Sequence, residues 1–125
     1  MEFREKEAIY LQIAAYVGEQ ITLDKWPLEE KIPSVRDLAV DLQVNPNTVV
    51  RAYEFLQNKS VISNKRGIGF FVEHDAKLKI REYKKERFLS QDLPEFFKSI
   101  YLLDLDMEQI SGLYRKYVAD NYPLK

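Results

Sequence analysis

The sequence contains no cysteine and only one histidine in 125 residues. Without cysteine there is no disulfide framework, no thiolate metal site and no cysteine nucleophile. A nucleophile and its base would have to come from Ser, Lys, Asp or Glu, and no spacing indicates such a pair, so we expect no enzyme activity. We interpret His74 as a hinge residue without an accompanying carboxylate cluster, and expect neither a metal ion nor a cofactor.

Long apolar runs are also missing. No stretch approaches the roughly 18 apolar residues needed to cross a bilayer. The N-terminal segment Met1–Glu7 carries acids where a signal peptide would be basic and then apolar. We therefore expect a cytoplasmic protein with no membrane partner.

An excess of positive charge is absent too, because the formal net charge is -1. This balance argues against a polycation that coats nucleic acid regardless of sequence. The charge is unevenly distributed, however. Between Gln43 and Arg66, the single acidic residue is Glu54, whereas the basic residues are Arg51, Lys59, Lys65 and Arg66. A small basic face of this kind fits a sequence-specific binder.

The chain does contain enough apolar residues for a packed core, since 46% of it is hydrophobic, and its length allows one domain or a small domain with an appendage. Apolar residues recur at every fourth position from Ala8 to Leu23 and predict a helix with one buried face, formed by Ile9, Ile13, Val17 and Ile21. Segment 24–31 lacks such a pattern and is predicted to be a loop in which Trp26 covers the core.

Two start signals for helices follow this loop. Ser34 can cap the first helix while Asp37 reaches back to it, and the buried face is predicted to hold Val35, Leu38, Ala39 and Leu42. Asn45 followed by Pro46 starts the second helix, which should run to about residue 58 with an inner face of Val49, Ala52, Tyr53 and Leu56. This spacing is typical of a helix-turn-helix that presents its second helix to a DNA groove.

Two short strands are predicted directly after these helices, at 61–63 and 70–72. The connection between them, 64–69, supplies glycines for a tight turn and has a basic tip. A hairpin in this place is typical of the wing of a winged helix-turn-helix, whose tip can reach a phosphate or an adjacent minor groove.

Four sequence blocks together resemble the N-terminal domain of the GntR family of bacterial transcription regulators: residues 9–13, 33–39, 45–49 and 67–72. The resemblance covers about residues 8–72 and implies contacts with operator DNA by Arg36, Asn45, Asn47, Thr48, Lys65, Arg66 and Gly67. Arg51 is added from the residues alone, because it makes the outward face of the second helix basic. Here the chain departs from the family pattern, since many family members have an arginine at the place of Val50, one position earlier.

Each of these residues also has a structural interpretation. Arg36 could pair with a neighbouring acid, and Lys65 and Arg66 could belong to a solvated turn. Thr48 fits a local hydrogen bond in the first turn equally well, and Asn45 is useful as a cap whether or not it contacts DNA.

The remaining residues, 73–125, predict a helical tail. Segment 76–87 is rich in lysine and arginine, and we interpret it as a solvated helix face, with a contact to DNA phosphates as the alternative. Pro94 should kink or restart the following helix near 90–93, and Asp106 should cap a further helix in which Leu105 and Ile110 form a hydrophobic staple. The apolar faces of these two helices predict a homodimer through Leu93, Phe96, Phe97, Ile100, Ile110, Leu113, Tyr114 and Tyr117.

The short tail also resembles the YtrA-type subgroup of the GntR family. This resemblance implies a dimerisation unit in place of a large effector-binding domain, and a repressor of genes for an ABC-type transporter. An effector, if one exists, would have to bind between subunits or domains, because the tail is too short to enclose a pocket of about 300 Å³ or more.

The sequence therefore predicts a mainly α-helical chain with a small β-hairpin, with a winged helix-turn-helix domain at 1–72 and a two-helix dimerisation tail at 73–125. The predicted function is that of a transcription regulator, in which a homodimer reads an inverted repeat in double-stranded operator DNA. The alternative is a winged-helix module that binds other proteins and no DNA. A polar recognition helix and a basic wing favour DNA.

Overall fold

The computed structural model describes residue 3 and residues 7–124. The chain divides into two compact units, with the boundary after Lys84. It is mainly helical with one two-stranded antiparallel hairpin, which confirms the predicted fold class. None of the helices in the described part of the chain has the length and apolar character that crossing a membrane requires.

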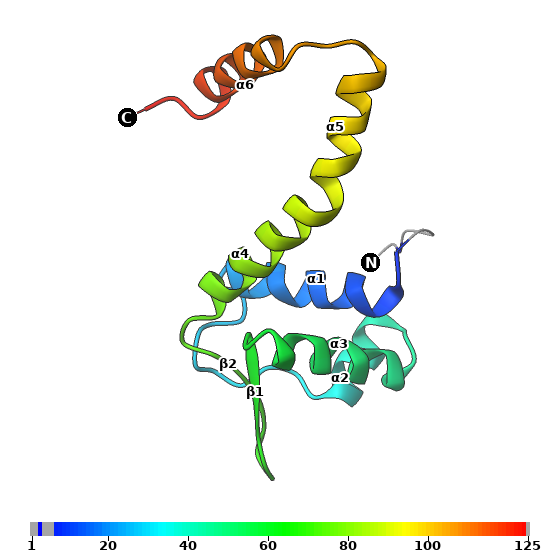
Figure 1. The fold of residues 1–125 in the computed structure, drawn as a ribbon. Coiled ribbons are helices and arrows are strands. Elements are labelled where there is room, and N and C mark those ends of the chain that lie inside the picture. Colours follow the sequence, from blue (N-terminus) through cyan, green and yellow to red (C-terminus); the bar gives the residue numbers. More distant parts are fainter. Residues whose placement is uncertain (1–2, 4–6, 125) are drawn as a thin grey trace. The chain divides into compact units, whose positions relative to one another are not determined.

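The first unit is built on α1 (Ile9–Thr22), α2 (Val35–Leu42) and α3 (Pro46–Asn58). Helices α1 and α2 both pack against α3 (Figure 1). The predicted inner faces of all three helices supply most of the core, although Ile9 is exposed and both Val35 and Leu42 are only partly buried. Trp26 packs at the edge of this core with its ring against Tyr16, which confirms its predicted place.

Both predicted helix starts are confirmed by hydrogen bonds. The Ser34 hydroxyl accepts from the Asp37 N–H at 3.1 Å, and the Asn45 side-chain oxygen accepts from the Asn47 N–H at 2.8 Å. Pro46 occupies the first turn of α3, where its missing N–H leaves no bond unmade. Between the two helices Gln43 takes a left-handed conformation with φ of 56°, which ends α2 and turns the chain into α3.

The hairpin consists of β1 (Ile62–Lys65) and β2 (Gly69–Val72), so the first strand lies slightly later than predicted. It projects from the helices of its unit, as Figure 1 shows. The predicted loop 24–31 contains no helix or strand, and only Lys31 at its end forms an isolated bridge, with Phe71 of β2. The Glu29 N–H also donates to Val72, and the Ile32 N–H, just after the loop, donates to Phe70. No local pattern of apolar residues records this backbone pairing with β2.

Helix α4 (Ala76–Arg87) begins within the first unit. Its residues Ala76 and Ile80 belong to the same core as α1 and α3, and the Tyr83 ring lies edge-on to Phe55. Lys77 pairs with Asp24 at 2.6 Å. The first compact unit therefore extends past the predicted boundary at residue 72, because two apolar residues of the basic segment complete its core.

The second unit contains the π-helix η1 (Phe88–Asp92), α5 (Leu93–Leu102) and α6 (Met107–Asn121). The new helix starts at Leu93 with Pro94 in its first turn, so the predicted restart at this place is confirmed. Proline has no N–H to donate to the preceding turn, and its ring displaces the carbonyl four residues earlier. Asp106 caps α6 by accepting from the Glu108 N–H at 3.1 Å.

Candidate nucleic-acid interface

The N-terminal end of α3 presents three of the predicted contact residues. Asn45 and Asn47 are exposed, whereas Thr48 is partly buried. The Thr48 N–H donates to the Asn45 carbonyl at 2.9 Å, which belongs to the local capping turn. The exposed Asn47 side chain is the one of the three best placed for an external partner.

Burial of the opposite face holds α3 in place. Val49, Ala52 and Leu56 have no exposed surface, and Tyr53 retains only 1%. The Tyr53 hydroxyl donates a hydrogen bond of 2.7 Å to the Pro33 carbonyl. The centre of the Tyr53 ring lies 4.8 Å from the centre of the Phe70 ring. This one side chain thereby ties α3 both to the entry of α2 and to strand β2.

Burial also affects the chemistry of Tyr53. Removal of the phenol from water raises its pKa far above the ordinary value, and the nearby Asp37 carboxylate adds to the rise. The hydroxyl therefore stays protonated and remains a hydrogen-bond donor to Pro33. The group serves the architecture of the helix-turn-helix and has no role as an acid or a base.

Arg36 lies in the first turn of α2 and is exposed. Pro33 lies three residues before Arg36, and its carbonyl accepts the hydrogen bond from Tyr53 of α3. This bond ties the start of α2, which carries Arg36, to α3. In the part of the chain that the structure describes, Arg36 takes part in no ion pair. The guanidinium is therefore open to a phosphate or a base edge.

The wing tip is a tight turn closed by the Ile68 N–H, which donates to the Lys65 carbonyl at 2.9 Å. Gly67 has φ of +79°, a conformation that favours glycine over other residues. Lys65 and Arg66 are exposed, and the Lys65 ammonium lies 4.2 Å from the centre of the Phe71 ring. The turn thus presents two cations at the end of a projecting hairpin.

A third cation at the wing was missed by sequence reasoning. Lys31 forms an antiparallel bridge with Phe71 across the edge of β2. Its side chain extends over Gly69, where an added Cβ would stand only 2.7 Å from the Lys31 Cε atom. No signal in the sequence marks Lys31, because its place depends on pairing with a strand that follows much later in the chain.

Arg51 lies differently from the other predicted contacts. Its guanidinium carbon stands 4.2 Å from the centre of the Tyr10 ring, on the side of α3 that packs against α1. The side chain is exposed but is engaged in a cation–π contact within the domain. Packing on Tyr10 gives this arginine a role within the domain, and its contact with DNA stays a prediction.

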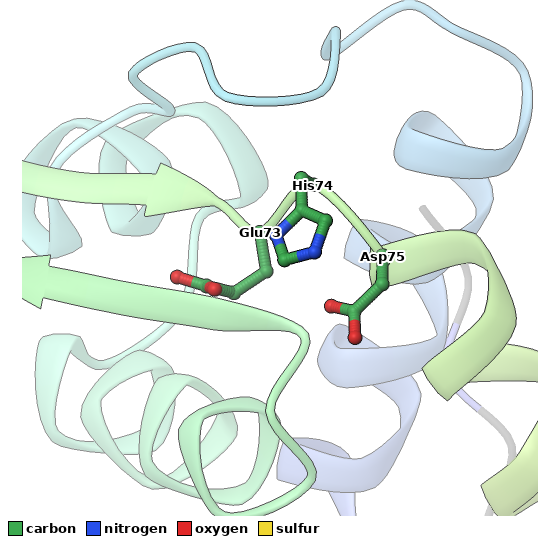
Figure 2. Close-up of side chains that lie close together, drawn as sticks. All are labelled: Glu73, His74 and Asp75. Carbon is green, nitrogen blue, oxygen red and sulfur yellow. The ribbon is translucent and has the colours of Figure 1, made fainter.

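A cluster of possible metal ligands joins β2 to α4 (Figure 2). Glu73, His74 and Asp75 each offer one ligand atom, and these atoms lie within 4.8 Å of one another. The expectation that no carboxylate cluster accompanies His74 was therefore wrong, since both of its sequence neighbours have a carboxylate oxygen in this group. All three residues come from one turn, and His74 is exposed, so the geometry is that of a polar connection between a strand and a helix.

The predicted dimerisation residues lie in the second unit and are mostly exposed. Phe96 retains 43% of its surface and Tyr114 retains 67%, whereas Ile100 is the buried exception at 7%. Several of them line a groove of about 860 Å³ between η1, α5 and α6. Its walls are formed mainly by Phe88, Leu93, Phe96, Met107, Ile110, Leu113, Tyr114 and Tyr117.

The arrangement of helix-turn-helix and hairpin agrees with comparison to known proteins. The sequence model for bacterial regulatory proteins of the gntR family matches residues 9–72. The chain belongs to the GntR family. It is thus a DNA-binding transcription regulator with a winged helix-turn-helix, and it is no enzyme.

Similarity to GntR proteins extends beyond the winged helix into the tail. The HTH-type transcriptional regulator YhcF of Bacillus subtilis is 30% identical over 87% of this chain and 88% of its own length. The HTH-type transcriptional repressor YtrA of the same organism is 28% identical over 94% of this chain and 89% of its own length. A crystal structure of a GntR family protein from Bacteroides thetaiotaomicron is 44% identical, with a TM-score of 0.79 over 90% of this chain and 98% of that chain. The short tail is therefore shared by relatives of similar length.

Proposed function

We propose that this GntR protein is a dimeric repressor that reads an inverted repeat in operator DNA. The observation that carries the proposal is the joint placement of an exposed Arg36, an exposed Asn47 and the wing cations Lys65 and Arg66 on one compact unit. Asn47 would enter the major groove with the start of α3, and the wing would contact the adjacent backbone or minor groove. Asn45 and Thr48 would help mainly by shaping the start of α3, and Gly67 by shaping the wing turn.

The dimer is proposed from the apolar surface of the second unit. Exposed aromatic and aliphatic side chains cover both α5 and α6, and a contiguous surface of this kind is typical of a protein interface. A second copy offers the same surface and can bury it about a two-fold axis. Two winged helices would then read two half-sites, which raises affinity for a chain whose net charge is only -1.

Repression and the target genes are proposed from the relatives. The similarity to YtrA, which is described as a repressor, supports repression, and the YtrA-type resemblance supports genes for an ABC-type transporter as the target. A regulator of this kind would act in the cytoplasm, where operator DNA lies. Any small-molecule effector would bind between subunits or domains.

The test begins by selecting operator sequences from a random duplex library with the purified full chain. We expect an inverted repeat that the protein retards in a mobility-shift assay at low salt. The Arg36→Ala variant should weaken binding of the selected duplex by at least about fivefold, as expected when one specific contact is lost. Its far-ultraviolet circular dichroism should remain unchanged because Arg36 is exposed.

Arg51→Ala is the matched comparison, because it removes the same charge from the same unit. Its effect on DNA binding should be much smaller, since Arg51 stacks on Tyr10. Equal losses of DNA affinity for Arg36→Ala and Arg51→Ala would place Arg51 in the DNA interface. That result would contradict the proposal that Arg51 lies outside it. Failure of the wild-type chain to retard any duplex would refute the operator-binding proposal and favour a protein-interaction module.

A further inference from the structure

We propose that Lys31 and Lys65 form a clamp for one DNA backbone phosphate on the outer face of the wing. The proposal rests on the operator-binding function above and adds a residue to it. Lys31 lies outside the helix-turn-helix and outside the hairpin tip, so neither motif assigns it a role. Its place is set by the strand-like pairing of segment 29–32 with β2.

The register puts the two lysines on one face of the wing. Lys31 bridges to Phe71 on one edge of β2, and Lys65 is paired with Gly69 on the other edge. Residues 69 and 71 are two apart and therefore point to the same face of the strand. Both lysine side chains thus lie on this face, on either side of the central strand.

The contacts of the two ammonium groups support this arrangement. The Lys65 ammonium stands 4.2 Å from the centre of the Phe71 ring. The Lys31 ammonium lies 3.5 Å from the point that a Cβ at Gly69 would occupy. Glycine at this position leaves room for the Lys31 side chain to cross the strand towards Lys65.

Both cations are available to an anion. Lys31 and Lys65 are exposed, and among residues 7–124 neither of them pairs with an acidic side chain, although Glu29 and Glu30 precede Lys31 in the chain. The opposite face of β2 is directed to the protein, because Phe70 packs on Tyr53 and Val72 is buried. The face with the lysines is therefore the one that can meet a ligand.

A phosphate of the DNA backbone is the ligand that fits these groups. Lysine binds phosphate as a point charge and reads no base, so the clamp would fix the wing on the duplex without contributing to sequence choice. The clamp is expected to act together with Arg66 at the tip, which lies one residue beyond Lys65.

The test measures how affinity for DNA depends on salt. A mixed-sequence duplex is titrated with full-length protein by fluorescence anisotropy at several salt concentrations. Loss of one phosphate contact lowers the slope of log K against log salt by about 0.9. We expect this decrease per subunit when Lys31→Ala and Lys65→Ala are combined, and a smaller decrease for Lys31→Ala alone, because Lys65 still contacts the phosphate. The proportional loss of affinity should be the same for the selected operator and for the mixed duplex. Lys31→Arg should retain the slope.

Lys59→Ala is the matched control, because Lys59 is also exposed and also lies over an aromatic ring, that of Phe55, at the far end of α3. For Lys59→Ala, the slope of log K against log salt should equal that of the wild type. An unchanged slope for Lys31→Ala, in a protein that still retards its operator, would overturn the clamp and leave the operator-binding function intact. Absence of wild-type binding to every duplex would instead overturn that function.

Discussion

At the scale of single residues, the tertiary structure changes the meaning of side chains that look alike in the sequence. Arg36 and Arg51 are both exposed arginines near helix starts, yet only Arg51 stacks on an aromatic ring of another helix. Periodicity placed Arg51 outside the buried face of α3, but it could not show that Tyr10 of α1 lies beside this side chain. Exposure alone therefore does not identify a DNA contact.

Tyr53→Phe is expected to lower the free energy of unfolding by about 1 kcal/mol, because the Pro33 carbonyl loses a partly buried hydrogen bond while the ring remains in place. Urea unfolding monitored by circular dichroism measures this loss. Operator affinity should fall as well, since the bond holds the start of α2 on α3. A loss of affinity with no loss of stability would contradict this structural role.

The same variant has a defined pH dependence. Because the pKa of Tyr53 is raised in the folded protein, folding favours the protonated phenol, and this contribution is fully present below the ordinary tyrosine pKa of about 10. As pH rises above that value, the unfolded chain loses the proton first and the contribution decreases. The wild type should therefore lose stability relative to Tyr53→Phe above about pH 10. A constant stability difference between the two proteins from pH 8 to the alkaline limit would contradict the burial effect.

At the scale of elements, helix starts were the most predictable features. A cap is a local interaction between a side chain and a backbone group two or three residues away, so Ser34, Asn45 and Asp106 could be identified from adjacent letters. The restart at Leu93 was predictable for the same reason, because Pro94 acts on its own turn. The backbone pairing of residues 29–32 with β2 was not predictable, since the partner strand lies about forty residues later, a separation that no local pattern records.

Asn45→Ala tests how much the recognition helix depends on its cap. We expect a loss of about 1 kcal/mol in unfolding free energy, because the Asn47 N–H loses its acceptor. Asn45→Ser keeps a neutral side-chain acceptor and should retain most of the stability, which makes it the matched control. If DNA binding falls for Asn45→Ser while stability holds, Asn45 contacts DNA in addition to capping α3.

At the scale of the whole molecule, the first compact unit ends after Lys84 and the apolar surface lies in the second. A chain cut after Lys84 should therefore fold, sediment as a monomer and bind the operator much more weakly than the full chain. Sedimentation velocity and anisotropy measure both properties. A full chain that remains monomeric at high concentration would refute the dimerisation role of the tail.

A chain cut after Val72 provides the comparison. It lacks Ala76 and Ile80, both buried in the core of the first unit. Removal of one buried isoleucine alone costs about 2 kcal/mol or more, so this chain should unfold at lower urea concentration than the chain cut after Lys84. Equal stability of the two truncated chains would show that α4 does not contribute to the core.

The sequence by itself determined the fold class, the start of each main helix, the place of the wing and the family, because caps, periodic apolar faces and turn glycines act over a few residues. It also placed most residues of the candidate DNA interface. Only the tertiary structure decided that Lys31 joins the wing, that Arg51 rests on Tyr10 and that α4 completes the first core. These features depend on contacts between segments distant in the chain, which local patterns of residues do not encode.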